Sequence, residues 1–212
     1  MITEQLQVIV ERYPTLHRIN VVNEPFEVTS GEPYPSVFQR VLGEDYLAEV
    51  FEIADEVAPD LVLNENAVEY IPAKADAFLA TIGDLIERGI PVDVAGLQTH
   101  LLAGDPNWEL FERLMADLDE MGIRIHVTEM DAPTSPDDPD RDSTQAARMA
   151  RVVRTCLDTP SCEAITVWGV HDGATWLEWF LEPGTEPLLY DNELSPKASY
   201  QAVADELRSG RS

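Results

Sequence analysis

The sequence has 212 residues, of which 44% are hydrophobic, so it can bury a sizeable core and we expect one domain over residues 1–212. Its 40 Asp and Glu residues outnumber its 14 Lys and Arg residues, and the formal net charge of -26 argues against a nucleic-acid or an anionic membrane partner. The sequence has no apolar run long enough to cross a bilayer and no signal peptide at its start, so we expect any export signal to lie upstream.

The acidic residues are scattered over the chain rather than gathered in a tail. Only Lys74 and Lys197 are lysines, so arginine supplies most of the positive charge. Such a surface repels itself in dilute buffer and is screened by salt. We therefore expect a protein adapted to high salt, with ordinary acidic solubility as the alternative hypothesis.

Helical and strand-like patterns alternate along the chain. A helix over residues 1–13 precedes a strand over 17–23, and a turn-rich segment with Gly31, Pro33 and Pro35 leads to a helix over 44–57. There follow strand 61–64, helix 74–88, strand 93–98, helix 108–121, strand 124–128, loop 132–142, helix 144–157, strand 164–168 and helix 196–208. Gly89 and Gly122 come just after two of these helices, where glycine commonly ends a helix.

Five strands joined by helices predict parallel strands with right-handed crossovers. An open doubly wound sheet and a (β/α)8 barrel are built from this same unit. No glycine-rich phosphate loop follows the first strand, which argues against a nucleotide-binding sheet. In a barrel, the carboxyl ends of the strands form the active site, and here those ends carry carboxylates, amides, a histidine and tryptophans.

Two strand ends carry a glutamate each. Glu24 follows the apolar run of the first strand, and Glu129 ends the fourth strand. Hydrolysis of a glycoside with retention needs two carboxyl groups about 5 to 5.5 Å apart, one to protonate the leaving oxygen and one to attack the anomeric carbon. Two strands of one barrel can supply such a pair, although a glutamate at a strand end is by itself more often a solvated loop residue.

Several short motifs occur in a characteristic order. They are Val-Val-Asn-Glu at 21–24, Gly-Leu-Gln-Thr-His-Leu at 96–101, Val-Thr-Glu-Met-Asp at 127–131, Thr-Val-Trp-Gly-Val-His-Asp at 166–172, Pro-Leu-Leu-Tyr-Asp at 187–191 and Ser-Pro-Lys-Ala-Ser-Tyr at 195–200. In order and spacing, they resemble the family 10 glycoside hydrolases, the retaining endo-β-1,4-xylanases, over about residues 4 to 206. Residues 64–67, Asn-Glu-Asn-Ala, depart from the family's Asn-Asp-Tyr-Asn type of sequence.

The resemblance implies a partial TIM (β/α)8 barrel that corresponds to strands 4–8 with their helices. It implies that Glu24 is the acid/base and Glu129 the nucleophile, with no metal and no organic cofactor. The supporting residues would be Asn23, His100 and Asp131, and the substrate-binding residues would be Gln98, Trp168, Asp172 and Trp176. Tryptophan suits this role because the C–H face of a sugar ring packs on a flat aromatic surface.

The expected substrate is xylan or a xylo-oligosaccharide, hydrolysed by double displacement. The alternatives are a catalytically inactive xylan-binding fragment, a structural fragment without its own function and a related retaining β-glucanase. An open five-strand barrel exposes two strand edges, so we expect a homo-oligomer, a separately supplied N-terminal segment or a shortened chain. The full-length parent is expected to be secreted.

The two cysteines, Cys156 and Cys162, flank a five-residue turn. A small-loop disulfide would suit an exported protein. The alternative is a pair of buried thiols at a helix end and a strand start. The spacing does not match that of a zinc site.

Overall fold

The computed structural model describes residues 2–57, 60–102, 104–181 and 183–210. Its single sheet contains β1 (Ile19–Asn23), β2 (Leu61–Glu65), β3 (Val94–Leu97), β4 (Arg124–Met130) and β5 (Cys162–Val167). Each strand pairs in parallel with the next strand of the sequence, so the sheet order is β1-β2-β3-β4-β5. This is the order of a barrel wall, and the predicted alternation of strands and helices is confirmed.

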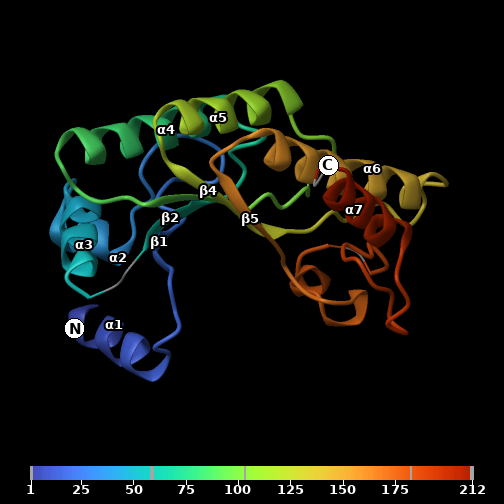
Figure 1. Cartoon of the computed structure of the whole chain (residues 1–212), viewed down its shortest axis with the longest axis horizontal. Helices are drawn as coiled ribbons and strands as arrows, with labels where there is room; N and C mark the ends of the chain where they lie inside the picture. Colours follow the sequence, from blue (N-terminus) through green and yellow to red (C-terminus); the bar gives the residue numbers. More distant parts are fainter. Residues whose placement is uncertain (1, 58–59, 103, 182, 211–212) are drawn as a thin grey trace.

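In the described residues, seven α-helices pack along one side of the sheet and at its two ends. They are α1 (Ile2–Arg12), α2 (Val37–Leu42), α3 (Tyr46–Asp55), α4 (Pro72–Glu87), α5 (Trp108–Glu120), α6 (Arg141–Asp158) and α7 (Ala198–Ser209), and Asp172–Ala174 and Trp176–Trp179 form short 3-10 helices. Figure 1 shows α4 and α5 along one side of the strands, with α1 to α3 at one end and α6 and α7 at the other. The chain therefore forms an arch whose opposite side is not covered by helices.

Helix boundaries follow local signals that the sequence contains. Pro72 begins α4, where its missing N–H is not needed. The side chain of Asn107 caps α5 by accepting a hydrogen bond from the Leu110 N–H over 3.1 Å. Gly89 and Gly122 have φ values of 74° and 73°, a left-handed conformation that favours glycine, so the two predicted helix ends are confirmed.

The sequence did not predict α2. Ser36 caps this helix by accepting a hydrogen bond from the Gln39 N–H over 3.0 Å, and Gly43 ends it. The helix has only six residues, and none of them is buried. A helix this short and exposed has no helical hydrophobic pattern that sequence analysis could detect. The prolines nearby favoured the prediction of a loop.

The core lies between the sheet and the helices on its outer side. Phe51 of α3, Phe78 of α4 and Phe111 of α5 are completely buried against it. Every residue of β2 and β3 is buried, whereas β1 and β5 are only partly buried. Within the described residues, β1 and β5 each pair on one side only, so the sheet is open at both edges.

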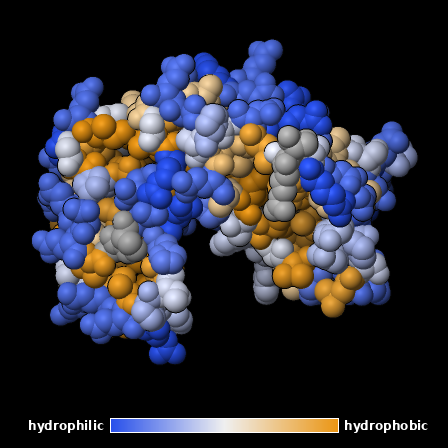
Figure 2. Space-filling model, viewed as in Figure 1, coloured by the Kyte–Doolittle hydropathy of each residue, from blue (hydrophilic) through white to orange (hydrophobic). Residues whose placement is uncertain are grey.

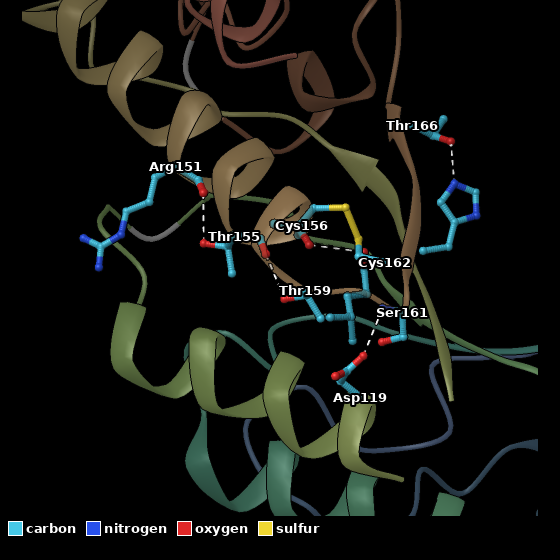
Figure 3. Close-up of a disulfide and its surroundings, with 11 residues drawn as sticks. Asp119, Arg151, Thr155, Cys156, Thr159, Ser161, Cys162 and Thr166 are labelled. Carbon is cyan, nitrogen blue, oxygen red and sulfur yellow. Dashed lines mark hydrogen bonds between the residues drawn. A yellow bond between two sulfur atoms is a disulfide. The ribbon is translucent and has the colours of Figure 1, made fainter. Parts of the chain in front are cut away.

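A disulfide joins Cys156 near the end of α6 to Cys162 at the start of β5. Figure 3 shows it closing the turn between the two elements, next to Asp119, whose carboxylate accepts a hydrogen bond from the Ser161 N–H over 2.9 Å. Of the two alternatives for the cysteines, the structure contains the disulfide.

No helix in the described part of the chain has both the length and the apolar character needed to cross a membrane.

Candidate active site

Polar side chains meet where the strands end. The main chain sets their positions through a ladder of hydrogen bonds: the Glu24 N–H donates to the Asn64 carbonyl over 2.9 Å, the Gln98 N–H to the Glu65 carbonyl over 2.9 Å, and the Glu129 N–H to the Gln98 carbonyl over 3.1 Å. Because parallel strands end at the same edge of a sheet, the two predicted catalytic glutamates lie on one rim.

A continuous series of amide hydrogen bonds links the two carboxyl groups. Nε2 of Gln98 donates to Oε1 of Glu24 over 2.9 Å and to Oδ1 of Asn23 over 3.1 Å. Nδ2 of Asn64 donates to the same Asn23 oxygen over 2.7 Å and to Oε1 of Glu129 over 2.8 Å. Amides do not titrate in the physiological range. The series therefore orients both carboxyl groups at any protonation state of the site.

The two glutamates differ in their surroundings. Glu129 is 9% exposed, and the hydrogen bond that its Oε1 accepts from Asn64 fixes its carboxyl group in place. Glu24 is exposed to solvent. Retaining glycoside hydrolysis uses two neighbouring carboxyl groups in different roles, and the structure places one that is fixed and buried on the same rim as one that is open to solvent.

His100 lies between two acidic groups. Its Nε2 is 3.3 Å from Oε2 of Glu129, and its Nδ1 is 3.0 Å from Oδ1 of Asp131. Burial lowers the pKa of the imidazole, but the contacts with Asp131 and Glu129 outweigh burial and raise this pKa to about 9. At neutral pH, His100 is therefore a cation held between the carboxylates.

Aromatic rings border the site next to His100. Nε1 of Trp176 donates to Oδ2 of Asp131 over 2.8 Å, and its ring centroid is 4.9 Å from that of His100. The ring of Trp168, which is 45% exposed, lies 6.5 Å from His100 in an edge arrangement. The hydrogen bond to Asp131 fixes Trp176, while Trp168 presents part of its surface to solvent.

Asp172, predicted to bind substrate, does not join this group of contacts. One of its oxygens accepts a hydrogen bond from the Leu188 N–H over 2.8 Å, and the other pairs with Nζ of Lys197 at 2.9 Å. Nζ of Lys197 also donates to the Glu186 carbonyl over 2.7 Å. Both oxygens of this buried carboxylate thus support the segment that leads from β5 to α7.

The sequence analysis missed the residues that hold Asn23 and Glu129 in register. Asn64 is completely buried, and its Oδ1 accepts a hydrogen bond from Oγ1 of Thr128 over 2.7 Å. Its Nδ2 donates hydrogen bonds to Asn23 and Glu129. Gly96 faces Asn64 across β2 and β3. The sequence contains one signal for Asn64: it directly follows the apolar run 61–63, at the carboxyl end of its strand. The predicted catalytic carboxyl groups lie at the carboxyl ends of other strands of the same sheet.

A buried glutamate follows shortly after β2. Glu69 is completely buried, and neither of its carboxyl oxygens has a hydrogen-bond partner among the described residues. Burial raises the pKa of this carboxyl to about 7.

In the part of the chain that the structure describes, no group of three or more His, Cys, Asp or Glu side chains could hold a metal ion.

Comparison with known proteins shows the family and the fold of the chain. The sequence model of glycosyl hydrolase family 10 matches residues 1–206. The chain belongs to glycosyl hydrolase family 10. The family assignment predicted from the strand-end motifs is confirmed, and the open sheet is part of a TIM barrel.

Xylanases are similar to the family 10 chain in sequence and in structure. Endo-1,4-beta-xylanase B of Thermotoga neapolitana is 32% identical over 190 residues, which cover 88% of this chain and 55% of the relative. The structure of xylanase 10B from Thermotoga petrophila RKU-1 in complex with xylobiose matches with a TM-score of 0.89 at 31% identity, covering 98% of this chain and 64% of that one. Native xylanase 10B from Thermotoga maritima matches with a TM-score of 0.88 at 31% identity, with 98% and 65% covered. The chain thus spans a little over half to two thirds of these relatives.

Proposed function

We propose that the family 10 chain carries the catalytic pair of a retaining endo-1,4-β-xylanase, with Glu24 as acid/base and Glu129 as nucleophile. The observation that supports this most strongly is the amide series from Glu24 through Gln98, Asn23 and Asn64 to Glu129. It holds two carboxyl groups on one rim, one buried and one open to water. Few structural roles need such an arrangement.

The reaction has two displacements. Glu129 attacks the anomeric carbon and forms a glycosyl ester while protonated Glu24 gives its proton to the departing sugar oxygen. Glu24, now a carboxylate, then takes a proton from water, and the resulting hydroxyl displaces Glu129 from the anomeric carbon. Because His100 is a cation beside Glu129, it favours the ionised nucleophile that the first step consumes and the second step regenerates.

Xylan and xylo-oligosaccharides are the proposed substrates. Relatives are named endo-1,4-beta-xylanases, and similar structures were solved in complex with xylobiose and xylotriose. Asn23 and Gln98 present polar groups beside the two carboxyls, and Trp168 and Trp176 supply flat aromatic surfaces next to His100.

The active assembly, we propose, covers the open edges of the sheet with a second copy or with further barrel strands. Figure 2 shows hydrophobic surface on both limbs of the arch and a hollow between them. Val37, Val41 and Val170 are more than half exposed, and unpaired strand edges invite pairing with another chain.

The disulfide supports a further proposal, that the parent protein is exported to an oxidising environment.

The stereochemistry of the first product tests the mechanism. Proton NMR during hydrolysis of xylohexaose should show the β-anomer of the new reducing end before mutarotation produces the α-anomer. An initial α-anomer would contradict a nucleophilic role for Glu129.

A further inference from the structure

A buried ion pair lies directly behind the strand ends. Glu65 at the end of β2 and Lys74 in α4 are both completely buried, and Nζ of Lys74 is 2.9 Å from Oε1 of Glu65. Asn66 completes the cluster, because its Oδ1 accepts a hydrogen bond from Lys74 over 2.7 Å and its N–H donates to Oε1 of Glu65 over 2.8 Å. The double displacement uses neither charge.

The second oxygen of Glu65 reaches the segment that carries the acid/base. Oε2 of Glu65 accepts a hydrogen bond from the N–H of Phe26 over 3.2 Å. Phe26 is buried and comes two residues after Glu24. The N–H of Glu24 itself is bound to the Asn64 carbonyl, so the turn at Glu24 is held by β2 on both sides.

This turn needs support because its backbone is strained. Glu24 has a φ of 54°, a left-handed conformation that is unusual for a residue other than glycine. Such a conformation is costly and persists only where the surroundings fix it. The hydrogen bond from Phe26 to Glu65 is one of the contacts that fix it.

Glu65 also supports the partner of Glu24. The carbonyl of Glu65 accepts the N–H of Gln98 over 2.9 Å, and the side chain of Gln98 donates to Oε1 of Glu24. The side chain of Glu24 is oriented by its hydrogen bond from Gln98. Glu65 accepts main-chain hydrogen bonds from Gln98 and from Phe26, and so supports the segments that carry both partners. Lys74 is needed because an unpaired carboxylate in this place would carry a large desolvation cost.

We infer that Glu65 and Lys74 are positioning residues, whose buried pair holds the strained turn at Glu24 so that its carboxyl points at the leaving oxygen. This inference rests on the proposed function of Glu24. It assigns a role in proton donation to two residues that do not touch the substrate.

Two double variants separate the hydrogen bond from the charges. Removing one charge alone would leave the other buried and unpaired, which is strongly destabilising. Glu65→Gln with Lys74→Met removes both charges and keeps an oxygen that can accept the Phe26 N–H. Glu65→Leu with Lys74→Met removes both charges and that acceptor. Because Oε1 of Glu65 also accepts the Asn66 N–H, the two variants carry the same charge and differ in the acceptor that position 65 offers to the N–H groups of Phe26 and Asn66.

Aryl β-xylobiosides with good and poor leaving groups measure the effect on proton donation. A good leaving group departs without help from an acid, whereas a poor one needs it. For the poor leaving group, we expect the Leu/Met variant to lose roughly 10-fold to 100-fold in kcat/KM relative to the Gln/Met variant, as for a misplaced catalytic group. For the good leaving group, the two variants should agree. Equal losses on both substrates would overturn the inference.

Two NMR signals test the same inference without turnover. In the wild-type chain and the Gln/Met variant, the Phe26 amide should be protected from hydrogen exchange. The Nε2 protons of Gln98 should have chemical shifts that differ from those of a solvated glutamine. In the Leu/Met variant, the protection should be lost and the Gln98 shifts should move to the solvated values. An unprotected Phe26 amide in the wild-type chain would overturn the inference, and so would unchanged signals in the Leu/Met variant. If the wild-type chain hydrolyses no xylobioside, the claim that this chain is itself an enzyme fails, and these signals still decide whether Glu65 holds the turn.

Discussion

Gly96 of β3 lies opposite Asn64 of β2 in the parallel register, and the missing side chain at Gly96 leaves the space that the Asn64 amide occupies. A Cβ atom at position 96 would overlap Oδ1 of Asn64 and lie 3.0 Å from Cγ1 of Val62. A glycine on one strand therefore sets the position of an amide that binds Glu129 on another.

Replacing Gly96 with alanine should displace Asn64 and weaken its hydrogen bonds to Asn23 and Glu129. We expect the free energy of unfolding in urea to fall by about 1 to 3 kcal/mol, as in other overpacked cores. The control is Gly83→Ala in α4, where the nearest atom to a new Cβ is Cε of Met121 at 3.8 Å. That change should stabilise the chain by about 0.5 to 1 kcal/mol. A neutral Gly96→Ala variant would show that the packing argument is wrong.

His100 should make stability depend on pH above neutrality. Its pKa is raised to about 9 in the folded chain, against about 6.5 in the unfolded chain. The stabilisation is then fully present below about pH 6.5 and is lost as the pH rises through about 9. Between pH 6 and pH 10, the free energy of unfolding of wild type should fall by roughly 3 kcal/mol more than that of His100→Asn, since one pKa unit corresponds to about 1.4 kcal/mol. Parallel curves for the two proteins would contradict this.

The disulfide should stabilise the chain through the unfolded state. Cys156 and Cys162 are six positions apart, so the bond closes a small loop. Chain entropy predicts a contribution of about 2 kcal/mol for a loop of this size. The variant with both cysteines replaced by alanine should lose that amount in urea unfolding. A reducing agent should destabilise the wild type to a similar degree and leave the variant unaffected; a reducing agent that lowers the stability of both would point to another cause.

The charge of the chain predicts that salt stabilises it. The formal net charge is -26, and raising NaCl from 0.1 to 1 M shortens the screening length from about 10 to about 3 Å. Salt also weakens surface ion pairs such as Arg113 with Asp76, but these are worth little. The free energy of unfolding should rise by on the order of 1 kcal/mol or more. KCl should act like NaCl if screening is the cause, and a flat or falling response would sink the hypothesis of salt adaptation.

The parts of the site that lie on strand ends could be predicted from the sequence. Each apolar strand of a parallel sheet delivers its next residues to the same rim, so Glu24 and Glu129 could be paired although 105 positions separate them in the sequence. Gln98 and His100 also lie at a strand end, but their roles, like those of the two glutamates, were inferred from the resemblance of the motifs to family 10. The strand determines where its end points, and the joint order of the motifs was needed to assign the roles.

Residues whose role depends on a neighbour across the fold could not be predicted. Asn64 matters because Gly96 makes room for it, and nothing near Asn64 in the sequence shows this. The partner of Asp172 could not be predicted either, because Lys197, which pairs with one of its oxygens, lies 25 positions later. The rarity of lysine was a signal that the sequence contains: arginine supplies most of the positive charge, and each of the two lysines pairs with a buried carboxylate.

The release of reducing sugar from xylan by the purified chain, measured across a range of salt concentrations, tests the central claim most directly. Wild type should release reducing ends. Glu129→Ala and Glu24→Ala should each lose most of this activity, with circular dichroism showing that all three proteins are folded. Folded wild-type protein that releases no more sugar than Glu129→Ala would contradict the claim that this chain is itself an enzyme.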